Sequence, residues 1–538
     1  MTKPKSGVVF LFLVAILVAM GGSALRPGVF MIGQHEGDAM HLLEIVLRMA
    51  DGDIPHVDFM TPLGALGFAP IVLFVEAGFG MGQATLWAQI LVAALFLPAI
   101  WWVAVSRFSG VWPYVFGVII VSLILAVVYG DAIRALTISM HYNRWAWAAS
   151  FVVIACTMLA SIHRRSAIAD GLVVGALMSF LALTKMTYFA AFLPAVAVAL
   201  LVRRQWGAIG VTVAVGVVAI FCMTALYGVS YWGAYIGDLL SVARSEVRPF
   251  PGDPFVAVLG APAYIGGSLI LLAGVVLLRQ GAMEVEGLVL LLLAPGFFYV
   301  TFQNFGNDPQ WLVLLGLLMF AALPSADMVN GWGWNMRQAV SAIGVAAIAL
   351  SLPSMANVLY SPFRHGASDP DKHTAILAKS ERHSDLMMNL ERYYVVNTLV
   401  PYADMGDVFL TYKESADRPE LVALAGEVPD RCQIERGLPA VFQAMADDLT
   451  EAGFGGATIL SVDIFSSLWL FGDFQRLPGG APWYYGGAPG LDAATHVLMP
   501  DCPVLPRVQK ILTEHIEKAD ISLVEVRRTP LYILYRKE

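Results

Sequence analysis

Residues 7–25 read GVVFLFLVAILVAMGGSAL, a run without a charged side chain. A helix needs about 20 apolar residues to cross a bilayer, so this run predicts a membrane span. It is longer than the roughly 7–15-residue apolar core of a cleavable signal peptide, which favours an uncleaved anchor. The 538-residue chain is 58% hydrophobic and only 14% charged, whereas a soluble domain carries about 25% charged residues. The sequence therefore predicts a polytopic α-helical membrane protein.

Further apolar runs bring the expected number of transmembrane helices to about eleven. They are 7–25, 86–106, 112–130, 146–162, 170–184, 188–202, 208–227, 256–278, 287–302, 310–326 and 338–355. Lys and Arg in short loops mark the cytoplasmic side, and the basic loops share one side only if residues 62–84 do not cross. We therefore interpret 62–84 as an interfacial or re-entrant helix, with an ordinary span as the alternative. The N-terminus is then cytoplasmic, and the region after residue 355 lies outside.

The first outer loop, residues 28–85, is unusually polar. It contains HEGDAMH at 35–41 and DGDIPHVD at 51–58, whereas the spans that follow carry almost no charge. Carboxylates and histidines gathered at one surface of a membrane protein indicate chemistry there, or the binding of a polar ligand. Apolar residues recur at helical spacing between the two stretches. They predict an amphipathic helix over 38–50 that lies flat on the bilayer.

Four later outer loops carry acids, cations, amides and aromatic side chains. They contain Asp131, the stretch from His141 to Trp145, Lys185, the acids and arginines of 228–255, and Asp308. With the first loop they would line one shared vestibule. Such a mixture suits a site for a lipid-linked phosphate and a sugar.

The C-terminal region, 356–538, has the composition of a soluble domain. Period-two apolar patterns predict strands at 457–462, 496–499, 521–526 and 531–535. Helices are expected at 373–395, 438–452 and 507–518. The chain is thus divided into a membrane core, 1–355, and an extracytoplasmic α/β domain. Outside the cytoplasm Cys432 and Cys502 could form a disulfide, or they could stay apart.

Two stretches resemble the membrane-embedded C-type glycosyltransferase superfamily, which includes protein O-mannosyltransferases, oligosaccharyltransferases and the aminoarabinose transferase of lipid A. One is Glu36-Gly37-Asp38 directly after the first span. The other is GDIPHVDFMTPLG at 52–64, similar to the bacterial pattern G-x-x-P-Y-x-D-F-x-x-P-x-G with His56 in place of tyrosine. A many-span core followed by an outer α/β domain is the third similarity.

The resemblance implies an inverting glycosyltransferase of cell-envelope glycan biosynthesis. Its donor would be a polyprenyl-phosphate sugar, its place the bacterial inner membrane, and its soluble domain periplasmic. It also implies an acid in the first outer loop that serves as general base or metal ligand. Asp38 matches that acid, with Glu36 close by, and Asp58 matches a second acid later in the loop. Which acid takes which role stays open.

The reaction explains why these residue types are needed. A base removes the proton of the acceptor hydroxyl, and cations or a metal offset the charge of the departing phosphate. Asp38 is the expected base. The candidate phosphate partners are Lys185, Arg144, Arg244 and Arg248, and the candidate acceptor or sugar contacts are His141, Tyr142, Asn143 and Asp308. Mg²⁺ or Mn²⁺ could bind Glu36 and Asp38.

These assignments also have alternative explanations that involve no catalysis. Arginines at a membrane surface often contact lipid headgroups, and Asp38 could simply complement a helix dipole. A transporter or flippase is the main alternative function, and a non-catalytic scaffold is another. Transporters usually carry polar groups at mid-membrane and repeated halves, and neither is evident here. No basic patch indicates nucleic acid. The acceptor could be a lipid, a glycan or a protein.

Overall fold

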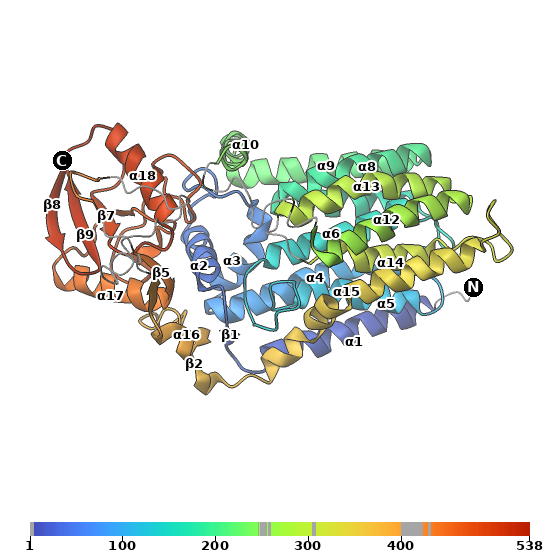
Figure 1. Ribbon diagram of the computed structural model, residues 1–538, viewed down its shortest axis with the longest axis horizontal. Coiled ribbons are helices and arrows are strands. Elements are labelled where there is room, and N and C mark those ends of the chain that lie inside the picture. The colour runs from blue at the N-terminus through green and yellow to red at the C-terminus, as the bar shows by residue number, and fades with distance from the viewer. Residues whose placement is uncertain are drawn as a thin grey trace, which may run out of the picture.

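The computed structural model describes residues 5–245, 247, 256, 260–303, 308–399, 423–428 and 432–538. A helical bundle and a smaller α/β domain lie end to end along the long axis (Figure 1). The N-terminus is at the far end of the bundle, and the C-terminus is in the α/β domain. The first outer loop lies between the two parts.

The bundle contains a helix at each predicted span. The helices are α1 Ser6–Leu25, α4 Met81–Arg107, α5 Trp112–Leu125, α6 His141–Met158, α7 Ala167–Thr184, α8 Met186–Val202, α9 Trp206–Tyr227, α12 Pro262–Gln280, α13 Glu284–Gln303, α14 Trp311–Ala321 and α15 Met336–Gly366. Seven of the described helices are long and apolar enough to cross a membrane, and α5, α8 and α14 are shorter apolar helices. The protein is therefore a multi-pass membrane protein. The number of crossings and their orientation remain predictions.

Small residues bring neighbouring helices of the bundle close together. A Cβ at Gly171 of α7 would lie 2.6 Å from Cβ of Val211 on α9, and one at Gly175 would lie 2.8 Å from Cβ of Val215. This small-xxx-small spacing is a usual means of packing helices in lipid. Helix α7 ends where Lys185 adopts an extended backbone with φ −149°, and α8 begins with the next residue. The break leaves Lys185 at the tip of the α7–α8 hairpin.

The segment 62–84 contains no helix long enough to cross. A 3-10 turn, Ala65–Gly67, leads into α3, Ala69–Glu76, and α4 begins at Met81. Eight helical residues extend only about 12 Å, which agrees with the non-crossing interpretation. Gly64 packs closely against the end of α7, where its N–H donates a hydrogen bond to the Thr184 carbonyl at 3.1 Å. A Cβ there would lie 2.2 Å from the Leu183 oxygen, so only glycine fits.

The expectation that the first-loop helix lies on the bilayer is wrong. Helix α2, Glu36–Ala50, lies between the bundle and the α/β domain (Figure 1). Its polar side chains are buried too, with Glu44 0% and Arg48 1% exposed. The polar flank finds partners in the outer domain, described below, instead of water and headgroups.

The described part of the outer domain contains three small sheets. The strands are β1 Phe30–Ile32, β2 His373–Ala375, β3 Leu386–Asn389, β4 Asn397–Leu399, β5 Gln433–Arg436, β6 Ile459–Ser461, β7 His496–Pro500, β8 Leu523–Arg528 and β9 Tyr532–Lys537, with helices α16 Leu390–Tyr394, α17 Leu438–Glu451 and α18 Pro506–Lys518. The sheet orders are β1-β3-β2, β4-β5 and β6-β7-β9-β8. Each predicted strand overlaps one member of the four-stranded sheet. Cys432 and Cys502 form a disulfide.

Two predictions differ from the structure: one concerns a whole helix and the other the end of a helix. The helix predicted at 373–395 is wrong, because β2, a turn, β3 and the short α16 occupy it. Strand β1 of the first outer loop pairs in parallel with β3, and such a distant partner leaves no local signal. Helix α15 continues to Gly366, well beyond the expected end at 355.

Candidate functional site

Asp38 lies in the first turn of α2, where it meets the start of α6. Its carboxylate accepts a hydrogen bond from Ser139 Oγ. The residues that precede the two helices, His35 and Met140, both adopt the left-handed region, with φ 62° and φ 59°. Non-glycine residues rarely do so, and such strained conformations cluster at functional sites. Two strained helix starts therefore meet beside Asp38.

Lys185 reaches the same segment from the α7–α8 hairpin. Its Nζ donates to Asn143 Oδ1 at 2.6 Å and lies 5.1 Å from the centre of the Tyr142 ring. Ser139 and Asn143 belong to one short stretch at the start of α6. The structure thus brings Asp38 and Lys185, from separate outer segments, onto residues 139–143.

A pair of carboxyl groups lies near the start of α2. Burial raises the pKa of Asp131, and the nearby Asp308 carboxylate adds to the rise. Burial also raises the pKa of Asp308. His35 is close enough to Asp131 to oppose its shift, and the His35 ring stacks on Tyr129 at 4.9 Å. Asp308 thus belongs to an acid pair at this end of the bundle.

Arg144 is buried beside the loop that precedes α6. Its guanidinium donates to the backbone oxygens of Val128 and of Ser139 at 2.9 Å, and the residue is 1% exposed. It holds the loop that presents Ser139, whereas its Nε and Nη2 are buried without a hydrogen-bond partner among the described residues, and its expected role as a phosphate partner stays a prediction. The loop has few regular hydrogen bonds of its own, and buried carbonyls need donors.

His141 also serves the fold more than a ligand. One ring nitrogen, Nε2, bonds the Gly67 carbonyl at 2.9 Å, and the ring packs edge-on against Trp145 at 5.0 Å. The residue is 2% exposed. Of the four expected sugar contacts, Tyr142 and Asn143 lie beside Lys185, whereas His141 is enclosed.

Glu36 is held by the outer domain. Its carboxylate accepts from Arg392 Nε of α16 at 2.7 Å. Within the described ranges no three His, Cys, Asp or Glu side chains form a group that could hold a metal ion. With Glu36 paired to an arginine and Asp38 bonded to Ser139, this donor set does not fit the expected Mg²⁺ or Mn²⁺. We derive no step through a metal.

The 52–64 motif folds as a compact turn. The Asp58 carboxylate accepts from its own loop, at Ile54 N, 2.6 Å away. His56 Nδ1 bonds Asp238 Oδ2 of α10, Ser230–Ala243, at 2.8 Å, and Thr61 N donates to the same oxygen at 3.0 Å. The motif thus anchors the first loop to α10. Asp58 closes a turn here, a structural part that is the alternative to its expected part as a second reacting acid.

Helix α2 is fixed to the outer domain by a buried polar cluster. Glu44 accepts from Ser466 Oγ at 2.8 Å and from Ser467 Oγ at 2.7 Å. Arg48 donates to Glu44 at 3.2 Å and to the Leu477 carbonyl at 3.0 Å. We call these residues the α2 clamp. Because Asp38 is on the same helix, the clamp also fixes the position of its carboxylate.

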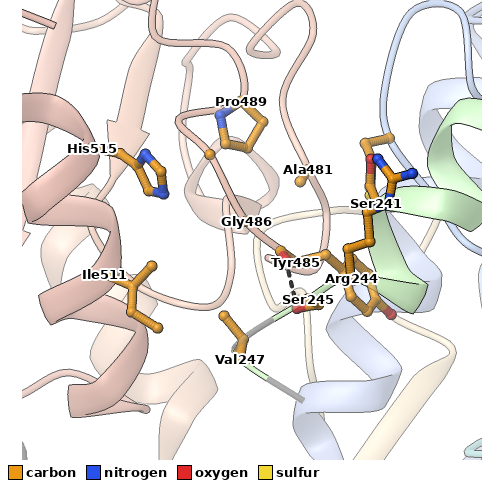
Figure 2. A pocket seen from close by; sticks show the side chains of 12 residues that line it. Ser241, Arg244, Ser245, Val247, Ala481, Tyr485, Gly486, Pro489, Ile511 and His515 are labelled. Carbon is orange, nitrogen blue, oxygen red and sulfur yellow. Dashed lines mark hydrogen bonds between the residues drawn. The ribbon is translucent and has the colours of Figure 1, made fainter. Parts of the chain in front are cut away.

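The remaining two arginines lie elsewhere. Arg244 follows the last residue of α10 and is exposed. It lines a cavity beneath the outer domain (Figure 2). Arg248 lies outside the described residues. Lys185 and Arg144 are therefore the two expected phosphate partners that the structure brings to the segment bonded to Asp38.

Comparison with known proteins gives a likeness of architecture. No family model matches the chain, and no curated protein matches it. Its structure is similar to that of ArnT from Cupriavidus metallidurans. The apo form is 12% identical, with a TM-score of 0.41, over 98% of this chain and 97% of that one. The form bound to undecaprenyl phosphate is 13% identical, with a TM-score of 0.42, over 99% and 98%.

Several residues of the site were not singled out from sequence. Ser139 lies in the second outer loop, and the loop's polar character was the only available signal. Glu44 and Arg48 were recognisable as an i,i+4 pair, but their serine partners lie more than four hundred positions away in sequence. Such distant contacts are decided by folding alone.

Proposed function

We propose that this protein is an integral membrane glycosyltransferase that moves a sugar from a polyprenyl-phosphate donor to an acceptor at the outer face of the membrane. One observation carries the proposal. An acid of the first outer loop and a lysine of a distant hairpin meet on residues 139–143, where Asp38 bonds Ser139 and Lys185 bonds Asn143. The resemblance of the first loop to C-type glycosyltransferases supports it independently.

The chemistry follows from these two side chains. The acceptor oxygen attacks the anomeric carbon while the bond from that carbon to the phosphate oxygen breaks, which inverts the configuration. The acceptor proton passes to Asp38, and general-base help of this kind contributes about 10²–10⁴-fold. The bond electrons leave with the polyprenyl phosphate. Lys185 offsets the charge that develops on its oxygen.

Two features keep the reacting groups in place. The Asn143 amide fixes Lys185 Nζ at 2.6 Å, and the Tyr142 ring lies 5.1 Å from the same ammonium. On the other side, the α2 clamp fixes the helix that carries Asp38. Positioning of this kind supplies much of an enzyme's advantage, because a misplacement of about 1 Å can lose a factor of about 10² in rate.

The charged pairs inside the bundle favour a transferase over a transporter. Arg107, the last residue of α4, pairs with Asp170 in the first turn of α7 at 2.7 Å. Arg203 follows α8 and pairs with Glu286 in the first turn of α13 at 2.6 Å. Both pairs lie at helix ends, so neither places a charge near the middle of the membrane. A transport pathway usually carries polar groups there.

The test is sugar transfer from a radiolabelled polyprenyl-phosphate sugar by purified protein in lipid vesicles. Asp38→Asn keeps the size of the side chain but removes the negative charge and the proton-accepting carboxylate. We expect it to lower kcat by about 10²–10⁴-fold, with an unchanged melting temperature. Asp58→Asn is the matched control, since that carboxylate accepts from Ile54 N of its own loop, and we expect near-normal transfer.

Three results would contradict the proposal in different ways. Full activity of Asp38→Asn would remove the assigned base while keeping the enzyme. Loss of activity in Asp58→Asn alone would move the chemistry to the motif turn. No transfer from any donor, together with movement of lipid or solute across the vesicle membrane, would establish a transporter.

A further inference from the structure

The loop between α14 and α15, residues 322–335, exposes two tryptophans at the end of the bundle where the N-terminus lies (Figure 1). Trp332 is 70% exposed and Trp334 is 56% exposed, and their rings meet edge-on with centres 5.7 Å apart. Val329 of the same loop is more than half exposed. We call these three residues the indole patch. Contiguous exposed apolar side chains mark contact surfaces, so the patch calls for a partner.

The hydrogen bonds of one asparagine give the patch a fixed shape. Asn330 Oδ1 accepts from Trp332 N at 3.0 Å and from Trp334 N at 2.9 Å. Asn330 N also donates to the Trp334 carbonyl at 3.0 Å. Gly333, with φ +80°, lets the chain turn between the two tryptophans. The exposed indoles therefore stand on an ordered turn, and little conformational entropy is lost when they are covered.

Further contacts hold this loop against the ends of two membrane helices. Asn330 Nδ2 donates at 2.9 Å to Oε1 of Gln280, the last residue of α12. Arg337 Nη1, in the first turn of α15, donates to the Pro324 carbonyl at 3.3 Å. A Cβ at Gly281, directly after α12, would lie 2.6 Å from Pro324 Cγ. Both helices are long and apolar enough to cross a membrane, so the patch lies near the level at which they leave the hydrocarbon.

Helix α15 connects the patch to a surface that lipid covers. Val345 and Leu352 of this helix are each more than half exposed. They lie about 14 Å and 24 Å from the start of the helix. Exposed apolar side chains on a membrane helix face lipid. The patch thus stands at the end of a helix whose exposed side is in contact with the bilayer.

The charges around the patch favour a lipid interface over a charged protein. The cations of the loop and of the neighbouring helix ends are Arg279 and Arg337, and the acids are Asp327 and Glu284. These charges balance, so they select neither an acidic nor a basic partner. Tryptophan is enriched at membrane–water interfaces, because its ring is apolar and its N–H reaches polar headgroups. Two indoles in a charge-balanced surroundings therefore fit the headgroup region.

We propose that the indole patch is a membrane anchor, in which Trp332 and Trp334 insert into the headgroup boundary of the nearest leaflet and fix the depth of α15. This helix runs for 31 residues to Gly366. Near its far end, His365 Nε2 accepts from Met31 N of β1 at 3.2 Å. One helix therefore joins the anchor to a sheet of the outer domain, and the depth of the anchor also sets the height of that sheet above the membrane. The anchor is independent of the proposed sugar transfer.

The experiment measures the depth of a spin label by electron paramagnetic resonance on the full-length protein in lipid vesicles. The label is attached to Gly331→Cys, because Gly331 is exposed and a Cβ there would meet nothing within 4 Å. The background carries Cys222→Ser, which removes an exposed free cysteine, whereas Cys156 is buried. Collisions with O2, which concentrates in lipid, are compared with collisions with a water-soluble nickel chelate. Val217→Cys on the exposed side of α9 is the lipid reference, and Lys518→Cys on α18 is the water reference.

We expect the label at position 331 to lie about 5–10 Å inside the boundary between headgroups and acyl chains. Its ratio of O2 to nickel collisions should be severalfold above that of the water reference. Trp332→Ser combined with Trp334→Ser should lower the ratio to that of the water reference. Tyrosine at both positions should keep it high, since tyrosine is also an interfacial residue. Because the surrounding charges balance, about 1 M salt should leave the ratio unchanged.

Three results would overturn the anchor. A label with the water ratio beside intact tryptophans would place the patch outside the membrane. A label shielded from both O2 and nickel would show that protein covers the patch, either a second copy or another chain. A deep label that stays deep in the double serine variant would assign its depth to the helices instead of the indoles. None of these measurements uses turnover, so loss of sugar transfer would leave them unaffected.

Discussion

Replacing Arg48 by Met should loosen the α2 clamp. The side chain is 1% exposed, and its partner Glu44 is 0% exposed. Removing one partner of a buried ion pair typically costs about 3–5 kcal/mol. Glu44 keeps its hydrogen bonds from Ser466 and Ser467, at 2.8 and 2.7 Å, so we expect the lower end, about 3 kcal/mol. Met retains most of the volume, so the change in charge dominates.

Hydrogen–deuterium exchange of the α2 amides in nanodiscs measures this loss directly, since exchange follows the free energy of local opening. A loss of about 3 kcal/mol corresponds to exchange roughly a hundredfold faster. Sugar transfer should fall in parallel, because Asp38 is on the same helix. Arg536→Met is the matched control: Arg536 is 55% exposed and pairs with the exposed Glu538 at 3.4 Å, and such surface pairs contribute about 0–1 kcal/mol.

A double variant tests whether the charge pair itself is responsible. Arg48→Met combined with Glu44→Gln removes both charges, so its loss should be smaller than the sum of the two single losses by about 1–3 kcal/mol. Unchanged α2 exchange in Arg48→Met, or strictly additive losses, would refute the reasoning. Other contacts, such as the bond between Glu36 and Arg392, would then hold α2 on the outer domain.

Three further predictions follow from single contacts. Lys185→Met should weaken polyprenyl phosphate binding about tenfold or more, measured by isothermal titration, with partial rescue by Lys185→Arg. Gly64→Ala should prevent normal folding, seen as loss of monodisperse protein, because its Cβ would lie 2.2 Å from the Leu183 carbonyl oxygen. The hydrogen bond from Arg527 lowers the pKa of Asp448. Its stabilisation is therefore present above the unfolded pKa of about 3.9 and lost as pH falls through the folded value, and Asp448→Asn should remove that component from the acid unfolding curve.

The membrane class of the protein was predictable because hydropathy acts locally. Each span can be recognised from its own residues, because a helix in lipid forms its backbone hydrogen bonds within the segment. The interpretation of 62–84 as non-crossing rested instead on the whole set of basic loops, which share one side only if that segment does not cross. Helices 438–452 and 507–518 were predicted almost to their observed bounds, since each has an apolar stripe at helical spacing.

Where a segment depends on a distant partner, the sequence was insufficient. Residues 373–395 carry a helix-like composition, yet β3 forms there because β1 of the first outer loop supplies its hydrogen bonds. Helix α2 has the amphipathic pattern of a surface helix, and only the docked outer domain buries its polar flank. The pattern reports which side chains are polar, but it does not report what covers them.

For the candidate site, the sequence indicated which residues belong to the polar loops, and tertiary structure decided which of them come together. Asp38 and Lys185 were chosen by residue type and position in the loops, and the fold brings both to the start of α6. Arg144, as a second phosphate partner, and His141, as a sugar contact, were also candidates. Their side chains satisfy buried carbonyls of Ser139 and Gly67. Most buried polar groups find a partner, and that choice of partner is made only when loops distant in sequence fold against one another.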